Sequence, residues 1–259
     1  MVDPAVRNTI VARLRSVEEA ESVRVIYACE SGSRAWGFAS SDSDYDVRFI
    51  FAHTKEWYLS IDDGSDVSEH NDGLLDISGW DIRKTLRLLR KSNPPLLEWL
   101  RSPIVYLEEP TTTGRIRGLA TSFFSLRSCL HHYLHMAEGN YREYLRGSEV
   151  KVKKYFYVLR PLLACMWIEA NNAAPPMEFE ELLRSQTLDD RLAAEIDRLL
   201  SRKRAGTEMD IEPRIDVMNE FIEATLSHFS YLAKNAASQP TPETRVLDEL
   251  FRETITSPW

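Results

Sequence analysis

Residues 30 to 51 (ESGSRAWGFASSDSDYDVRFIF) combine residue types that can act on a phosphorylated substrate. Gly32 and Ser33 follow an apolar run and open a short helical turn. There, backbone N–H groups and a small hydroxyl can receive phosphate oxygens without an intervening side chain. Asp44 and Asp46 lie two residues apart at the edge of the next apolar run. The stretch therefore predicts a phosphate-binding turn followed by a pair of carboxylates.

The spacing of Asp44 and Asp46 suits a metal site. Side chains two residues apart on a strand emerge on one face, so both carboxylates can bind the same hard cation, such as Mg²⁺. Metal ions held in this way neutralise a triphosphate and lower the pKa of an attacking hydroxyl, as in two-metal in-line displacement. We therefore expect phosphoryl-transfer chemistry at these residues.

The acidic stretch also resembles three arrangements that fit it less well. Asp42, Asp44 and Asp46 match the first three acidic positions of an EF-hand loop, but Val47 replaces the required glycine and His53 the closing glutamate. An Asp-x-Asp pair also occurs in sugar-nucleotide glycosyltransferases, which would not need the Gly-Ser turn upstream. The plain structural alternative is a serine-rich turn with acidic caps.

Short strands are predicted on both sides of the turn. Residues 23–29 (VRVIYAC) and 47–52 (VRFIFA) are β-branched and aromatic, which is typical of strands, and 74–80 (LLDISGW) predicts a third strand. The polar residues 60–73 between the last two predict a loop. These strands would carry the turn and the carboxylates at their ends.

Helices are predicted before and after these strands. Asp3 and Pro4 form a cap and a first turn, and apolar residues then recur at helical spacing, which predicts a helix over 5–20. Asp81 is placed to cap a helix that follows it. Beyond residue 112 the pattern is helical almost throughout, with stretches around 115–146, 150–170, 178–203 and 213–235.

This order of elements predicts an α/β (α+β) protein of two domains. A small mixed-sheet domain over residues 1–112 would hold the site, and an all-helical domain over residues 113–259 would close the nucleotide cleft. No internal repeat interrupts this plan.

The composition narrows the functional classes. The 259 residues contain 32 Lys and Arg against 40 Asp and Glu, a net charge of −8, which disfavours wrapping a long nucleic acid but allows a local basic groove. Cys29, Cys129 and Cys165 lack the paired spacing of a zinc knuckle or disulfide framework, so the reducing cytoplasm fits best. No apolar run reaches membrane-spanning length, so no membrane partner is expected. The oligomeric state is not predicted.

The Gly32-Ser33 turn, its spacing to Asp44-Tyr45-Asp46 and the strand after them resemble the signature of the DNA polymerase beta-type nucleotidyltransferase superfamily. Further along, SGWDIRKTLRLLRKSNPPLLEWLRSPIVY and VKKYFYVLRPLLACMWIE resemble the branch of predicted bacterial and phage nucleotidyltransferases typified by YcgL and RlaP. The RlaP type is associated with RNA-repair ligases. The resemblance covers about residues 24 to 225.

The resemblance implies roles for individual residues. The metal-binding pair falls on Asp44 and Asp46, and the phosphate-binding residues fall on Gly32 and Ser33, with Arg34 adjoining. A third carboxylate in a hydrophobic-Asp-hydrophobic pattern falls on Asp76 of Leu75-Asp76-Ile77, where it would complete the metal site and act as general base.

Asp81 is the rival for the third carboxylate. It differs from Asp76 by an odd number of residues, so it would face the other side of a continuous strand. Helix capping explains Asp81 adequately, and Asp76 is therefore preferred.

Two basic stretches are further candidates for ligand binding. Lys153, Tyr157 and Arg160 fall within a narrow arc of a predicted helix and could contact the triphosphate and base, although side chains snorkelling over a packed helix explain them equally well. Six basic residues against the single acid Glu98 could guide an RNA end or a nucleotide, or form a solvated helix face; they are Arg83, Lys84, Arg87, Arg90, Lys91 and Arg101.

Histidines and tryptophans offer weaker candidates. His131, His132 and His135 have helical spacings that could bind zinc, but nothing at a characteristic spacing completes such a site. Trp36 and Trp80 flank the two acidic motifs and could line a base pocket, with core packing as the alternative.

Together these observations predict nucleotidyl transfer that depends on Mg²⁺ or Mn²⁺. A nucleoside triphosphate, with ATP as the default on abundance alone, would donate its nucleoside monophosphate to an unidentified acceptor hydroxyl, such as an RNA or tRNA end. The alternative is a nucleotide-binding sensor or toxin-antitoxin component that keeps the fold without turnover.

Overall fold

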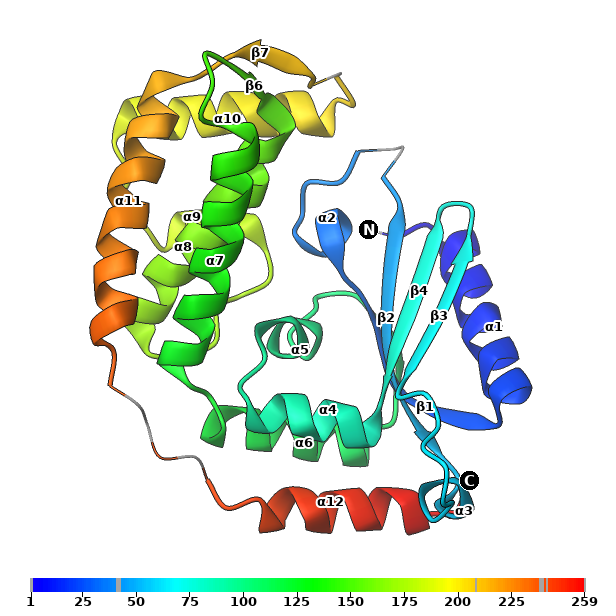
Figure 1. The fold of residues 1–259 in the computed structure, drawn as a ribbon. Coiled ribbons are helices and arrows are strands. Elements are labelled where there is room, and N and C mark those ends of the chain that lie inside the picture. The colour runs from blue at the N-terminus through cyan, green and yellow to red at the C-terminus, as the bar shows by residue number, and fades with distance from the viewer. Residues whose placement is uncertain (1, 41–42, 208, 238–239, 241, 259) are drawn as a thin grey trace. The chain divides into compact units, whose positions relative to one another are not determined.

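The protein is described here by a computed structural model that covers residues 2–40, 43–207, 209–237, 240 and 242–258 (Figure 1). The chain divides into two compact units. The sheet unit comprises Met1–Ala35, Asp44–Phe123 and Thr241–Trp259, and the helical unit comprises Trp36–Ser43 and Phe124–Pro240. Each unit is therefore built from segments that are distant in the sequence.

A mixed sheet of five strands forms the centre of the sheet unit. Its order is β3-β4-β2-β1-β5. β2 and β4 run parallel, whereas the other neighbouring pairs are antiparallel. The strands are β1 (Val23–Glu30), β2 (Tyr45–His53), β3 (Val67–Asp72), β4 (Leu75–Asp81) and β5 (Val105–Glu108).

One face of this sheet is covered by α1 (Pro4–Glu21) (Figure 1). The carboxylate of Asp3 caps the helix by accepting from the backbone N–H of Ala5 at 2.7 Å. Ile10 and Leu14 are fully buried in a cluster with β-strand residues such as Phe49. This hydrophobic cluster fixes α1 to the sheet.

Helices α4, α6 and α12 of the sheet unit contact the strands and one another. α4 and α6 contact β2 and β1, respectively, and α12 contacts α4, α6 and β2. Figure 1 shows α12 running along α4 and α6. The elements are α2 (Gly32–Ala35), α3 (Lys55–Tyr58), α4 (Ile82–Arg90), α5 (Pro94–Trp99), α6 (Pro110–Ser122) and α12 (Arg245–Thr256).

The helical unit has its own hydrophobic core around α8, which is buried along most of its length. None of the described helices is long and apolar enough to cross a membrane. Its elements are α7 (Leu126–Tyr144), β6 (Glu149–Lys151), the 3₁₀ helix η1 (Val152–Lys154), α8 (Tyr155–Asn171), α9 (Phe179–Arg184), α10 (Asp190–Arg204), β7 (Ile211–Pro213) and α11 (Asp216–Asn235).

A short segment, residues 36–43, leaves the sheet unit directly after α2 and belongs to the helical unit. Phe38 is 2% exposed in the helical core. Its ring stacks on Phe156 at 5.0 Å and meets Phe179 edge-on at 5.5 Å. The chain thus contributes to the helical core before it forms β2.

The mixed α/β fold class and the three predicted strands are confirmed. The predicted loop over 60–73 is wrong in part, because Val67–Asp72 forms β3. β3 lies at the edge of the sheet and is mostly polar, and such strands lack the apolar alternation from which strands are predicted. The sequence also did not indicate β5.

The described helices break where the predicted stretches ran on. The 115–146 stretch is divided between α6 and α7, and the 178–203 stretch between α9 and α10. The boundary expected near residue 112 falls within α6, and the sheet unit continues to Phe123 and takes up α12 again. The residues of α12 show only that they form a helix. Nothing in their local sequence indicates that this helix packs with the sheet unit, more than 100 residues earlier in the chain.

Candidate active site

Two of the predicted carboxylates lie side by side on parallel strands. Asp46 of β2 is paired in register with Asp76 of β4, so their side chains share one face of the sheet. Arg48 lies on the same face two residues beyond Asp46. Its Nη2 donates to Asp46 Oδ1 at 3.1 Å and to Asp76 Oδ2 at 2.8 Å. A single guanidinium therefore bridges the two carboxylates.

The pKa of Asp46 is shifted by its burial and by the charged groups around it. Burial raises the pKa of Asp46, the Arg48 guanidinium opposes that shift, and the negative charges of Asp76 and Asp44 add to it. A cation bound at Asp46 would offset the negative charge that surrounds this carboxylate.

Asp44 immediately precedes β2 and is exposed to solvent. Its backbone carbonyl accepts from Arg34 Nε at 3.2 Å, and the Arg34 guanidinium lies 3.8 Å from the centre of the Tyr45 ring. These contacts tie the residues after the Gly-Ser turn to the start of the strand that carries Asp46.

Gly32 brings the turn of α2 directly against Asp46. Its φ is +58°, and a Cβ at this position would lie 1.9 Å from Asp46 Oδ2. Only glycine tolerates both the backbone conformation and the close approach. The backbone N–H of Ser31 also donates to the Asp46 carbonyl at 2.8 Å. Gly32 therefore adjoins Asp46, and half-buried Ser33 follows it in the same turn.

Glu30 supports Asp46 from inside the protein and was missed at the sequence level. Its side chain is fully buried, Oε1 accepts from the backbone N–H of Asp46 at 2.9 Å, and Oε2 accepts from the Tyr106 hydroxyl. Its backbone carbonyl accepts from Ser102 Oγ at 2.6 Å. A glutamate that ends an apolar strand just before a glycine turn is the signal that could have identified it.

Burial raises the pKa of Glu30 to about 7, although the hydrogen bonds from Tyr106 and from the Asp46 backbone act in the opposite direction. A buried carboxylate with its acceptors used in this way holds the backbone of Asp46 in place.

Asp81, the rival third carboxylate, lies at the far end of β4. It caps α4, since Oδ1 accepts from the backbone N–H of Arg83 at 2.7 Å and Oδ2 accepts from the Tyr58 hydroxyl at 2.5 Å. The side chain is 1% exposed. The geometry therefore places Asp76, and not Asp81, beside Asp46.

The chemistry of the donor set fits a hard divalent cation, because Asp44, Asp46 and Asp76 offer only carboxylate oxygens. As they stand, the described side chains hold no group of three His, Cys, Asp or Glu ready to bind a metal. We infer that the Arg48 guanidinium, which bridges Asp46 and Asp76, occupies the place of a metal ion. A cation that binds between these two carboxylates would have to displace that guanidinium. Asp42 lies outside the described residues.

The structure does not gather Lys153, Tyr157 and Arg160 into one exposed stripe. Arg160 is 3% exposed, donates to the carbonyl of Met177, and lies 4.6 Å from the centre of the Trp36 ring. Lys153 is exposed in the 3₁₀ helix, and the ring of Tyr157 meets Trp36 edge-on. The expectation that Arg160 faces a ligand is corrected, because residue 36 covers it.

The structure assigns Trp80 to packing and places the three predicted histidines on one helix. Trp80 stacks on Trp99 at 3.8 Å, which accounts for it as core packing. His131, His132 and His135 lie on α7, and among the described residues they belong to no group that could hold a metal.

The sequence matches the family described as "RlaP: RNA repair pathway DNA polymerase beta family" over residues 6–253. The chain belongs to this family. The uncharacterized protein YcgL of Bacillus subtilis (strain 168) is 49% identical over 254 residues, which cover 98% of each chain. The predicted membership of the polymerase beta-type superfamily is thereby confirmed.

A solved structure shares features with the chain only weakly. The crystal structure of a nucleotidyltransferase-like protein from Exiguobacterium sibiricum 255-15 aligns over 96% of this chain and 82% of that chain, with 14% identity and a TM-score of 0.31. A score this low does not establish a common fold, so the family assignment depends on sequence.

Proposed function

We propose that this member of the polymerase beta family is a nucleotidyltransferase (EC 2.7.7 type) that depends on Mg²⁺ or Mn²⁺ and transfers a nucleoside monophosphate from a nucleoside triphosphate to an acceptor hydroxyl. The observation that supports it best is the in-register pairing of Asp46 with Asp76, together with Gly32 in contact range of Asp46. This arrangement supports the proposal because the Gly32 turn, which we propose binds phosphate, lies beside the paired carboxylates.

Each residue has a distinct role in this reaction. The acceptor oxygen attacks the α-phosphorus, the bond from that phosphorus to the bridging oxygen breaks, and pyrophosphate leaves with the electron pair. Asp76 takes the proton of the acceptor hydroxyl. Ser33 and the backbone N–H groups beside it, with Arg34, bind the departing phosphates. Bound Mg²⁺ would neutralise the phosphates and activate the hydroxyl, held by Asp44, Asp46 and Asp76.

ATP is proposed as the donor on its cellular abundance, and an RNA or tRNA end is proposed as the acceptor. The family's description as an RNA repair pathway family favours that acceptor. We also propose that the protein acts in the reducing cytoplasm, which suits its three buried cysteines, Cys29, Cys129 and Cys165.

One observation favours a second function. The Arg48 guanidinium pairs with both Asp46 and Asp76 and offsets part of their negative charge, as would suit a sensor or toxin-antitoxin component that binds nucleotide without turnover. In that case nucleotide would stabilise the protein, but no product would form.

The test is transfer of α-³²P label from each of the four ribonucleoside triphosphates to total RNA and total protein, with Mg²⁺ or Mn²⁺. Wild type is compared with Asp46→Asn, for which we expect a loss of about a hundredfold or more. Asp63→Asn is the matched control, because Asp63 is an exposed aspartate away from the site and should leave transfer unchanged.

Label that enters one pool and is lost only in Asp46→Asn would support the proposal and identify donor and acceptor class. No transfer, combined with a melting temperature that rises with nucleotide, would favour the sensor. Equal transfer by Asp46→Asn and wild type would refute the assignment of the site.

A further inference from the structure

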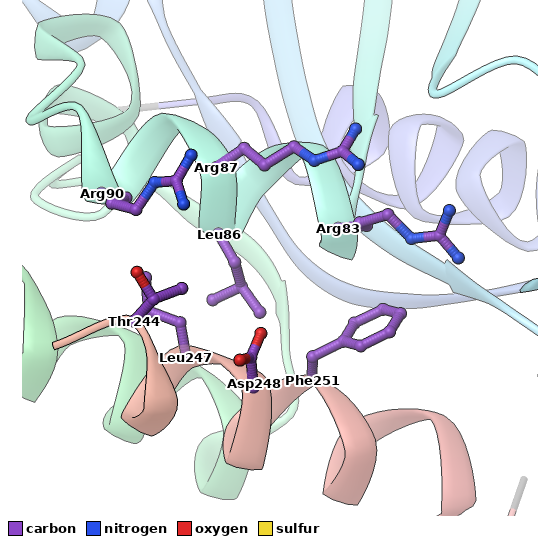
Figure 2. A pocket seen from close by; sticks show the side chains of 8 residues that line it. All are labelled: Arg83, Leu86, Arg87, Arg90, Thr244, Leu247, Asp248 and Phe251. Carbon is purple, nitrogen blue, oxygen red and sulfur yellow. The ribbon is translucent and has the colours of Figure 1, made fainter.

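A groove between α4 and α12 lies within the sheet unit and has a volume of about 410 Å³ (Figure 2). Its size is in the range of sites that take small ligands or parts of larger ones. α4 contributes three arginines and Leu86, while residues of α12 rise toward them from the other side. The opposite wall consists of Thr244, which directly precedes α12, and of Leu247, Asp248 and Phe251 of α12.

The three arginines form a continuous stripe. Arg83, Arg87 and Arg90 lie four and three residues apart, within a narrow arc of the helix, and span about 10 Å at 1.5 Å per residue. Arg83 is held in place, since its guanidinium lies 4.8 Å from the Tyr58 ring centre and 5.4 Å from that of Phe251. It therefore forms a fixed wall of the groove.

Arg87 and Arg90 differ from Arg83 because they are exposed, and neither side chain forms a hydrogen bond or ion pair with any residue that the structure describes. Asp248 faces the same groove without pairing to either of them. Two arginines with all their donors available beside an apolar floor are suited to an anionic ligand that also has a flat, apolar part.

The groove is separate from the candidate active site. α4 begins after Asp81, at the opposite end of β4 from Asp76. These two aspartates are five positions apart along the strand, or about 17 Å at about 3.3 Å per residue. A ligand in the groove therefore lies well away from the paired carboxylates.

We propose that the α4–α12 groove binds the phosphate backbone of an RNA strand. The donors are spread along the helix and do not converge on one point, which matches successive phosphates better than the single phosphate cluster of a free nucleotide. Partly exposed Phe251, backed by the buried side chains of Leu86 and Leu247, offers a base an aromatic surface. The chain carries a net charge of −8, so RNA binding needs a local cationic surface, and the arginine stripe of α4 supplies one.

This inference rests on the proposed function in one respect only, the choice of RNA as the acceptor. It concerns binding and not chemistry, so the two proposals can fail separately. The strand held in the groove would be the part of the acceptor away from its reacting end.

The experiment measures the dissociation constant of a fluorescein-labelled, single-stranded oligoribonucleotide for the full chain by fluorescence anisotropy, over a range of salt concentrations. Arg87→Gln/Arg90→Gln is expected to weaken binding about tenfold or more, since it removes charge-assisted hydrogen bonds at two positions. The slope of log K against log salt should fall by about 1.4, or about 0.7 per lost phosphate contact. Asp248→Asn should tighten binding, because it removes a negative charge from the same wall.

Arg184→Gln/Arg191→Gln is the matched control for net charge. Both arginines are exposed on the helical unit, at 75% and 85% of the side chain, and each loses the same formal charge. This pair should leave the dissociation constant within about twofold of wild type.

The proposal is overturned if the control pair weakens binding as much as the α4 pair, or if the α4 pair leaves binding unchanged. It is also overturned if free AMP competes at the concentration, per nucleotide, at which unlabelled oligoribonucleotide does. If wild type shows no nucleotidyl transfer but the Arg87→Gln/Arg90→Gln variant still binds RNA more weakly than wild type, the groove is supported and the proposed reaction fails. If transfer is normal but RNA binding is insensitive to Arg87 and Arg90, the reaction stands and the groove fails.

Discussion

Replacing Gly32 with alanine tests whether the turn and the carboxylate are in contact. The new Cβ would lie 1.9 Å from Asp46 Oδ2 and 2.7 Å from its Cγ, at a φ of +58°. The backbone conformation costs an L-residue about 1–2 kcal/mol, and the overlap adds about 1–3 kcal/mol because Asp46 must move. We therefore expect the free energy of unfolding to fall by about 2–5 kcal/mol.

The chain offers a matched control for the backbone part of this cost. Gly73 has a φ of +61°, but nothing lies within 4 Å of the position that its Cβ would take. Gly73→Ala should therefore lose only about 1–2 kcal/mol. The difference between the two variants measures the overlap at Asp46.

Urea denaturation and label transfer, measured on both variants, separate stability from activity. Gly32→Ala should lose transfer under conditions where it remains folded, whereas Gly73→Ala should keep it. In addition, Asp46→Ala should restore part of the stability lost in Gly32→Ala, since it removes the two nearest atoms. If Gly32→Ala and Gly73→Ala lose equal stability and equal activity, the contact between the turn and the carboxylate is refuted.

Three further perturbations test the site and its supports. Arg48→Met leaves the charges of Asp46 and Asp76 unbridged, so the free energy of unfolding at pH 7 without metal should fall by about 1 kcal/mol. Added Mg²⁺ should then raise the melting temperature of this variant more than that of wild type. An equal effect of Mg²⁺ on both proteins would argue against competition between Arg48 and the metal. Asp81→Ala should lower the free energy of unfolding by about 2 kcal/mol, because the first turn of α4 and the Tyr58 hydroxyl lose their hydrogen-bond acceptor. Asp76→Ala should instead abolish transfer with little change in urea unfolding. Reversed effects would make Asp81 the third carboxylate. For Glu109, burial acts to raise the pKa, but hydrogen bonds from the first turn of α6 outweigh burial and lower the pKa from 4.5 to about 2. The stability that Glu109 provides is therefore complete above about pH 4.5 and is lost as the pH falls toward 2, so Glu109→Gln should lower the free energy of unfolding by about 1 kcal/mol at pH 7. Unfolding curves in which this cost persists undiminished at about pH 2 would contradict the assignment.

Local patterns in the sequence predicted the part of the site that depends on strand geometry. The two-residue spacing of Asp44 and Asp46 and the alternation around Asp76 carry information about which face a side chain occupies. The register of β2 against β4 then brings Asp46 and Asp76 together. Alternation along the strand also predicted that Asp76 and Asp81 face opposite sides, and in the structure Asp76 lies beside Asp46 whereas Asp81 caps α4.

The rest of the site depends on contacts between segments that are distant in sequence. The carboxyl of Glu30 is held by the hydroxyl of Tyr106, 76 residues away, and a polar residue at the end of a strand gives no sign of such a partner. Arg160 shares a helical arc with Tyr157 in projection, but it is covered by Trp36. A helical projection describes one helix and contains no information about what packs against it.

The interleaved order of the two units has a consequence for synthesis of the chain on the ribosome. The core around Phe38 needs α9, about 140 residues later, and the sheet needs α12 at residues 245–256. Neither unit can complete its core from a single early stretch, and the surfaces of β2, α4 and α6 that α12 contacts stay uncovered until almost all of the chain has been made. Contacts this distant in sequence slow folding and prolong the exposure of strand edges. We therefore expect nascent chains that stop before α12 to depend on chaperones more than the full chain does.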